Sequence, residues 1–437
     1  MRDEVSHAAP KSAVTRLAAT GAARTVRPSS LTSALRSHRS VPALVALALA
    51  MIACEAADRP ATDDVTAPGT TAPVTPAPTP PPTPPTTPPT TPPTTPPVAS
   101  GSWQSISPPV NLALHGSENF GFQTIGLSPA NPNIVYVGTC YEGIWKTTNQ
   151  GVSWSRVSTG SNGPNLATGR NWTLAVDPTD ANILYTVAGY GAGQGLWKST
   201  NGGIDWTQML PQSVTSAATA DIYSISINPA DRNHLLAGSH SGWNFTANAG
   251  VLESKDGGAT WTLHQPQGSW GKGHYVFFIN STTWLLGTQD AGFWRTANSG
   301  SSWSKVSNDH IQHGGGQLYR SSTGALYTGA LNTLLRSTDN GASWSRVGPS
   351  TSDGYNAIIG DGTTMYAQRA NTGMATTAVT PYIVSRESDG VTWTAHNNGI
   401  QTFGNGPINM VFDATNRIIY SSNWRAGVWK LAVGPAQ

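Results

Sequence analysis

The sequence has few charged residues and almost no cysteine. Charged side chains make up 11% of the 437 residues, and there are 2 cysteines. Low charge together with 46 glycines and 16 tryptophans argues against a disordered chain, a coiled coil or a helical bundle. The composition therefore predicts an all-β domain.

The chain also lacks a basic domain, although its formal net charge is +2. Residues 1–53 hold seven Lys/Arg against two Asp/Glu, whereas residues 101–437 hold 17 of each. The positive charge belongs to the N-terminus. A domain without net charge is not expected to bind nucleic acid.

The N-terminus has the pattern of an export signal. An apolar run over residues 41–53 is too short to span a membrane and has the length of a signal-peptide core. The run ending Met51-Ile-Ala-Cys54 resembles a bacterial lipobox, which implies lipidation of Cys54 and a lipoprotein in the periplasm or at the cell surface. The alternative is an ordinary secretory signal that leaves Cys54 free.

A proline-rich linker follows the signal. Half of the 32 prolines lie between Pro60 and Pro97, in Thr-Pro repeats that lack apolar side chains to bury. Residues 54–100 are therefore predicted to be a disordered, semi-rigid spacer. With Cys54 lipidated, Cys140 has no partner, so the domain over residues 101–437 would be stable without a disulfide.

One short element recurs six times in that domain. It reads Ser/Thr-x-Asp/Asn-x-Gly-x-Ser/Thr-Trp, is degraded in the sixth copy, and ends at Trp154, Trp206, Trp261, Trp303, Trp344 and Trp393. The Asp or Asn accepts backbone N–H groups in a tight turn, Gly supplies an unusual backbone conformation, and Trp packs the turn on a sheet. The element resembles the Asp-box, or BNR repeat. This motif is a specific indicator of the fold, but it indicates almost nothing about function.

Short β-rich runs surround each box and predict four strands per unit, which is a propeller blade. The predicted first strands begin near residues 123, 170, 222, 274, 316, 355 and 408. The last unit lacks a fourth strand, and residues 102–106 resemble one. We therefore predict a seven-bladed β-propeller whose ring is closed by a strand from the N-terminus.

Repeat position explains 12 of the 16 tryptophans. The other four fall in or beside loops of the expected ligand face, where exposed indoles would stack on sugar rings. We predict a ligand site from Trp172, Trp243, Trp270, Trp424, His240 and Arg425. The alternative is that the tryptophans cover hydrophobic rims.

The sequence is compatible with two alternative sets of catalytic residues. Because first strands begin near the central channel, Arg170, His274, His313 and Tyr355 would form a polar ring suited to eliminative cleavage of a uronate polysaccharide. Glu142 and Asp290 would instead suit glycoside hydrolysis, which needs two carboxylates roughly 5–10 Å apart. Ordinary loop residues are the alternative for both sets.

His310 and His313 have a spacing that could serve a metal ion. No third ligand accompanies them in the sequence pattern. We predict neither a metal nor another cofactor.

The repeats resemble those of bacterial BNR propellers, a group with sialidases, glycoside hydrolase family 74 xyloglucanases, sortilin-type receptors and Ycf48-like assembly factors. Sialidases carry an Arg-Ile-Pro, which is missing here, and the first blade has no arginine before Arg156, so a true sialidase is not expected. The runs beginning at Asn131 and Trp197 resemble family 74 more closely. That family places its cleft between two propellers, so a second chain would be needed here.

These observations predict a monomeric, exported propeller that binds extracellular polysaccharide and is tethered to the membrane by lipid. Whether it also cleaves the polymer, as a hydrolase or a lyase, stays open. The alternative is a protein-assembly or adhesion scaffold without catalysis.

Overall fold

The computed structural model describes most of the domain that follows the linker. The described residues are 101–209, 222–239, 250–264, 270–273, 275–312, 315–350, 354–369, 382–396 and 406–434. The signal segment, Cys54 and the linker lie outside them. None of the described helices is long and apolar enough to cross a membrane.

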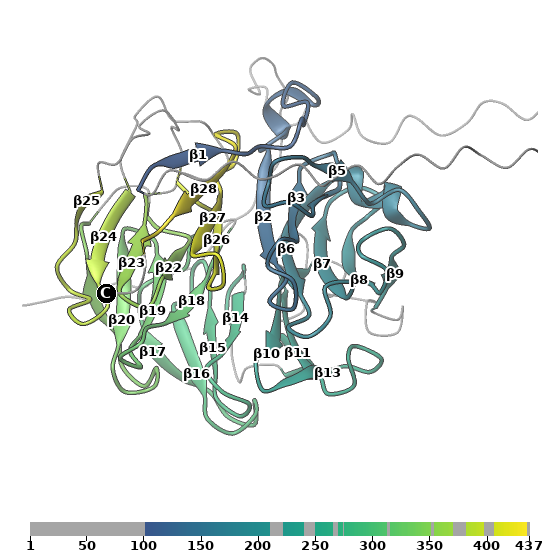
Figure 1. Ribbon diagram of the computed structural model, residues 1–437. Helices are drawn as coiled ribbons and strands as arrows, with labels where there is room; N and C mark the ends of the chain where they lie inside the picture. Colours follow the sequence, from purple (N-terminus) through teal and green to yellow (C-terminus); the bar gives the residue numbers. More distant parts are fainter. Residues whose placement is uncertain are drawn as a thin grey trace, which may run out of the picture. The chain divides into compact units, whose positions relative to one another are not determined.

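Seven four-stranded antiparallel sheets form the seven blades of a β-propeller (Figure 1). The first strands are β2 (Phe122–Leu127), β6 (Arg170–Val176), β10 (Ile222–Asn228), β14 (Tyr275–Phe278), β18 (Leu318–Arg320), β22 (Ile358–Gly360) and β26 (Asn409–Asp413). The second strands are β3 (Val135–Thr139), β7 (Leu184–Gly189), β11 (Asp231–Ser239), β15 (Trp284–Gly287), β19 (Leu326–Ala330), β23 (Thr364–Ala367) and β27 (Ile418–Ser422).

The third and fourth strands complete each blade. The third strands are β4 (Ile144–Thr147), β8 (Gly195–Ser199), β12 (Val251–Ser254), β16 (Phe293–Thr296), β20 (Thr333–Ser337), β24 (Tyr382–Arg386) and β28 (Val428–Ala432). The fourth strands are β5 (Ser155–Arg156), β9 (Thr207–Gln208), β13 (Thr262–His264), β17 (Ser304–Ser307), β21 (Ser345–Val347), β25 (Thr394–His396) and β1 (Trp103–Ser105). Two short 3-10 helices, η1 (Gly116–Glu118) and η2 (Gly163–Ala167), lie in the loops. Each predicted first strand begins within three residues of the observed one.

The ring closes as predicted. Strand β1 pairs antiparallel with β28, with Trp103 opposite Leu431, so the first described strand completes the last blade. The Trp103 ring stacks on Tyr382 of blade 6 at a centroid distance of 4.2 Å. Closure leaves the sheet array without an open end, which is how a propeller avoids edge-to-edge association.

Hydrogen bonds within the box of blade 5 explain why the residues of the repeat have a fixed spacing. The Ser343 amide donates to Asp339 Oδ1 at 2.9 Å, and the Gly341 amide donates to Ser337 Oγ at 2.9 Å. Gly341 has φ 81°, a conformation that side chains resist. Trp344 Nε1 donates to the Gly341 carbonyl at 3.1 Å, so the tryptophan holds the turn against the sheet.

Candidate functional site

The loops between second and third strands gather on one face of the ring with the starts of the first strands. We call this the channel face, and its described loops include residues 140–143, 190–194, 288–292 and 423–427. Arg170 opens β6 on this face and forms a β-bridge with Cys140 of blade 1. Phe122 forms the equivalent bridge with Trp424 between blades 1 and 7.

Arg170 lies in a cage of aromatic side chains. Its guanidinium carbon is 3.9 Å from the ring centroid of Phe120 and 5.0 Å from that of Tyr190. Its Nη2 is 2.8 Å from Glu118 Oε2; the Arg170 side chain is 11% exposed and that of Glu118 66%. Rings stacked on a guanidinium stabilise its charge through their quadrupoles. The cage therefore holds a cation at the surface between blades 1 and 2.

Tyr141 and Tyr190 occupy equivalent turns in neighbouring blades: Tyr190 directly follows β7, and Tyr141 follows β3 after Cys140. Their φ angles are 62° and 66°, which bulky residues rarely adopt. Tyr190 is 36% exposed, and His115 stacks on Tyr141 at 4.0 Å. Burial is the main cause that raises the pKa of Tyr141. Strained residues of this kind cluster at binding sites.

The sequence reasoning did not select these two tyrosines. The signal was present in blades 1 and 2, because in both an aromatic residue comes within two positions of the end of the second strand and a glycine comes within two positions after it, as Gly143 after Tyr141 and Gly191 after Tyr190. That pattern places an aromatic at the tip of a second-to-third-strand turn, on the channel face.

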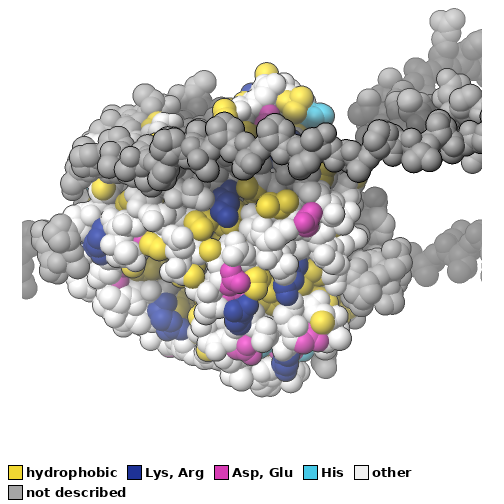
Figure 2. All heavy atoms as spheres, turned by 45° about the vertical axis from the view of Figure 1, so that its right-hand side comes forward, with side chains coloured by type: hydrophobic (Ala, Val, Ile, Leu, Met, Phe, Trp, Pro, Cys, Tyr) yellow, Lys and Arg dark blue, Asp and Glu magenta, His cyan; other side chains and the backbone are white. Residues whose placement is uncertain are grey.

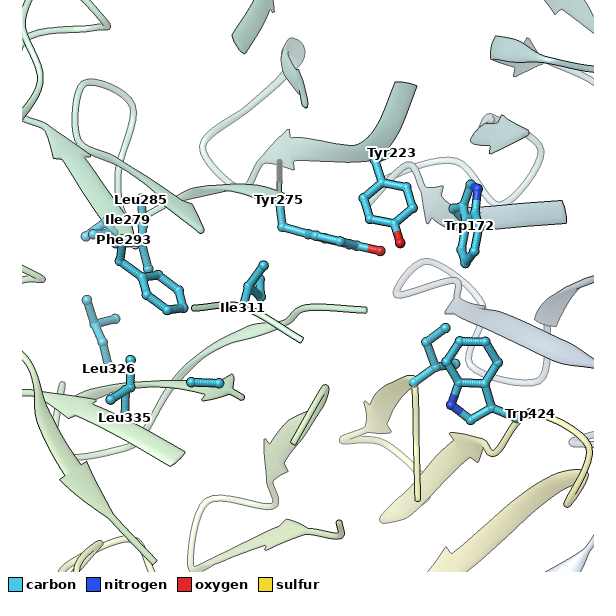
Figure 3. Close-up of a cluster of buried hydrophobic side chains, with 12 residues drawn as sticks. Trp172, Tyr223, Tyr275, Ile279, Leu285, Phe293, Ile311, Leu326, Leu335 and Trp424 are labelled. Atoms are coloured by element: carbon cyan, nitrogen blue, oxygen red, sulfur yellow. The ribbon is translucent and has the colours of Figure 1, made fainter. Parts of the chain in front are cut away.

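Three of the four predicted sugar-stacking tryptophans are buried, which corrects the expectation of exposed indoles. Trp172, Trp270 and Trp424 are 3%, 2% and 1% exposed. Trp172 stands at a β-bulge in β6 and packs edge-on against Tyr223 at 4.9 Å, and Tyr223 packs on Tyr275 at the same distance (Figure 3). These rings belong to a hydrophobic cluster shared by several blades.

Trp270 and Trp424 are buried for similar reasons. Trp270 packs edge-on against Trp303 at 4.9 Å in a hydrophobic cluster shared by blades 3 and 4. Trp424 lies edge-on to Phe120 at 6.0 Å and faces the middle of the cluster that Figure 3 shows. All three indoles are therefore packing residues. Trp243 and His240 lie outside the described residues.

The structure does not bring Tyr355 to the channel with Arg170. Tyr355 is 2% exposed and packs in the apolar cluster of blades 5 and 6 with Tyr327 and Leu334. Its hydroxyl donates to the Pro349 carbonyl at 3.3 Å. Burial raises the pKa of Tyr355 to about 12, which is unsuited to a general base at neutral pH. The other two members of the predicted ring, His274 and His313, lie outside the described residues.

The two predicted carboxylates stand in blades 1 and 4, with blades 2 and 3 between them. Glu142 Oε1 accepts the Asn111 amide at 2.7 Å, and Asp290 Oδ1 accepts the Lys272 amide at 2.9 Å. Each carboxylate thus fixes a loop of its own part of the ring.

Arg425 likewise anchors a loop. Its Nη1 donates to the carbonyls of Gly116 and Asn119 at 3.0 and 3.1 Å, which ties η1 to blade 7. Positive and negative side chains alternate over the view in Figure 2, without a basic patch on the described surface shown there. Within the described ranges, no three His, Cys, Asp or Glu side chains are grouped to hold a metal ion.

Comparisons with known proteins find xyloglucanases among the similar sequences, and GH74 enzymes and YCF48 among the similar structures. No family model matches. A xyloglucanase of Hypocrea jecorina is 26% identical over 301 residues, which cover 57% of this chain and 35% of the xyloglucanase. The chain thus spans about a third of that relative's length. It is a distant relative of the glycoside hydrolase family 74 xyloglucanases.

Solved structures show the same fold. An ancestral GH74 enzyme matches with TM-score 0.54 and 19% identity, over 75% of this chain and 46% of the enzyme. YCF48 bound to D1 peptide matches with TM-score 0.53 and 12% identity, over 77% of this chain and 98% of YCF48. The chain therefore shares the seven-bladed propeller with both groups.

Proposed function

We propose that this chain is an exported, monomeric propeller that binds extracellular polysaccharide of the xyloglucan type at its channel face. The observation that carries the proposal is the pair Tyr141 and Tyr190, held at equivalent strained turns of blades 1 and 2, with Tyr190 forming part of the Arg170 cage. The relation to xyloglucanases supports the choice of polymer.

The cage offers the groups that a sugar chain needs. A tyrosine ring presents an apolar face to the C–H side of a pyranose and keeps a hydroxyl for hydrogen bonding. Glu118 is mostly exposed and can accept from sugar hydroxyls beside Tyr190. Aromatic side chains that are already fixed lose little entropy on binding.

We propose binding without cleavage by this propeller alone. Glu142 and Asp290 each accept a backbone amide in separate blades, so a hydrolytic pair would need a second chain. A lyase mechanism would depend on His274 and His313, since Tyr355 is in the core. An unsaturated product absorbing in the ultraviolet after incubation with a uronate polymer would identify the lyase.

The test is binding of xyloglucan by affinity electrophoresis and calorimetry. Tyr190→Ala should weaken binding about 5- to 30-fold, because loss of one aromatic anchor costs roughly 1–2 kcal/mol. Val391→Ala is the matched control, since Val391 is exposed in the turn of a box hairpin, on the opposite face. Equal affinity of Tyr190→Ala and the parent chain would contradict the proposed site.

We also propose that the protein is anchored through lipid on Cys54. The lipobox-like run supports this, and the proline-rich linker would hold the ring away from the membrane. Cys54→Ser should move the protein from the membrane fraction to the soluble fraction. Unchanged fractionation would favour another mode of retention.

A scaffold for protein assembly is the second candidate. It is favoured by the match to 98% of YCF48, which consists of a similar single ring. Absence of binding to every member of a glycan panel, with stable capture of a partner protein by the channel face, would select this function.

A further inference from the structure

At three junctions of the ring, a box turn packs on a cation of the blade that precedes it. A box turn is the stretch from the Asp or Asn to the Gly of the repeat. Lys198 Nζ of blade 2 donates to the Gly257 carbonyl in the box turn of blade 3, at 3.0 Å. Arg295 Nε of blade 4 donates to the Asn340 carbonyl of blade 5, also at 3.0 Å.

The same contact crosses the ring closure from blade 7 to blade 1. Lys430 Nζ donates to the Gln150 carbonyl at 3.1 Å. In these blades the cation on the third strand lies opposite a residue of the second strand, as Lys430 opposite Tyr420 and Lys198 opposite Tyr185. A third-strand cation and a box-turn carbonyl are thus a repeated junction between blades.

Blade 6 departs from this pattern because of how the ring closes. The fourth strand of blade 7 is β1, so within the described ring blade 7 has no turn from third to fourth strand. No box turn of blade 7 therefore covers the described part of blade 6. The residue opposite Tyr366 on the third strand is Val384 instead of a cation.

A cavity of about 450 Å³ lies at this position. We call it the blade-6 cavity; it is lined by Asp361, Tyr366, Arg386 and Ser388 of blade 6, and by Arg417 and Gly434 of blade 7. Its volume is within the range of small binding sites. The cavity is at the ends of first and third strands, on the face opposite the channel face.

On one side of the cavity, the polar groups form hydrogen bonds with one another. Asp361 is 5% exposed, and Tyr366 Oη donates to its Oδ2 at 3.2 Å. Arg417 donates from Nη1 to the Asp361 carbonyl at 2.8 Å and from Nε to the Gly434 carbonyl at 3.0 Å. These groups form a fixed polar wall.

The other side presents donors. Arg386 and Ser388 are exposed, and among the described residues the Arg386 guanidinium has no hydrogen-bond or ion-pair partner. At three other junctions, the cation beside the second strand donates to a turn carbonyl. By analogy with these junctions, a compact turn with its carbonyl oxygens facing the cavity would place acceptors beside Arg386.

We propose that the blade-6 cavity is a docking site for an Asp/Asn-x-Gly turn of a partner protein, which takes the position that a box turn takes at the other junctions. The turn's carbonyls and its Asp or Asn side chain accept from Arg386 and Ser388. A tight turn fits the cavity better than an extended strand does, because the cavity is short and is closed on one side by Arg417.

The experiment uses the full chain and a fluorescein-labelled peptide with the sequence of residues 337–344, Ser-Thr-Asp-Asn-Gly-Ala-Ser-Trp. Fluorescence anisotropy should show saturable binding below about 1 mM. Arg386→Gln should weaken it at least about 5-fold, as expected for loss of a charge-assisted hydrogen bond. Ser388→Tyr, which fills the mouth of the cavity, should abolish it.

Two controls separate this site from general effects. Arg156→Gln removes an exposed arginine of blade 1 and should leave peptide affinity unchanged. A peptide with Asp339→Ala and Gly341→Ala should not bind. Xyloglucan affinity should be the same in Arg386→Gln and the parent, because the cavity and the channel face are on opposite sides.

The proposal is overturned by any of three results: no saturable binding of the peptide, equal binding by Arg386→Gln in a variant with parental melting temperature, or equal binding of the altered peptide. Complete competition by acetate at the concentration of the peptide would also overturn it, since the site would then recognise a carboxylate without the turn.

Discussion

Lys198 of blade 2 reaches across to blade 3, where its Nζ lies 3.0 Å from the carbonyl oxygen of Gly257. Burial lowers the pKa of Lys198, and the ammonium is placed over the face of Tyr185 at 5.3 Å. The contact joins a repeated third-strand residue to a repeated turn, so the box motif stabilises the junction between blades as well as its own hairpin.

Lys198→Met should lower the free energy of unfolding by about 1–2 kcal/mol, because the Gly257 carbonyl loses a charged donor. Urea denaturation followed by tryptophan fluorescence measures this. Lys255→Met is the control, since that side chain is 67% exposed and should change stability by less than about 0.5 kcal/mol. Equal effects of the two substitutions would contradict the role of the junction.

The boxes also predict how stability depends on pH. Hydrogen bonds from Ser343 lower the pKa of Asp339 to about 2, and those from Thr260 lower the pKa of Asp256 to about 2. A carboxyl whose pKa is lower in the folded chain stabilises the fold above its unfolded pKa of about 3.9. That contribution is lost as the pH falls through about 2.

Asp339→Asn should therefore reduce the fall in melting temperature between pH 5 and pH 2. The amide fits the turn, because Asn149 Nδ2 already donates to Ser153 Oγ at 2.9 Å in blade 1. The reverse change, Asn149→Asp, should enlarge the fall. Calorimetry at both pH values measures the effect, and identical pH profiles for both variants would refute it.

Arg170→Met should destabilise the ring by about 1–3 kcal/mol, because it removes a cation that Phe120 and Tyr190 enclose. Glu118→Gln should cost less than about 1 kcal/mol, since Glu118 is 66% exposed and water screens the pair. Urea titration of both variants gives the comparison. A larger loss for Glu118→Gln would show that the ion pair, and not the aromatic cage, dominates.

Cys140 should be chemically inert in the folded protein. It is buried, and burial raises the pKa of its thiol to about 12, so the reactive thiolate is scarce at pH 8. In a Cys54→Ser background, Ellman's reagent should detect no thiol before unfolding and one after it. Fast reaction of the native protein would place Cys140 at the surface.

The parts of the fold that could be predicted from the sequence are those that the repeated motifs encode. Each box carries its own turn chemistry within a few residues, as in the bonds of Asp339 to Ser343 and of Trp344 to Gly341, so six copies were enough to predict a propeller. The number of blades came from the seven first strands, and the ring closure came from the strand-like run at residues 102–106. Strand positions followed because each blade repeats the same alternation before its box.

The candidate site was much less accessible to sequence reasoning. Trp172 and Tyr355 fall at positions that topology brings to the channel end of a first strand, yet a bulge packs Trp172 against Tyr223, and Tyr355 enters the core of blades 5 and 6. Exposure depends on which neighbouring blade covers a side chain. No pattern local to one blade contains that information.

The sequence by itself determined an all-β ring of seven repeated blades, because its box and strand signals are local and each copy repeats the same short-range hydrogen bonds. Tertiary structure alone decided the cage around Arg170, the burial of Trp424 and the cavity beside Arg386. Each of these lies where residues of different blades meet. Its geometry depends on contacts between residues far apart in the chain, which a one-dimensional period does not specify.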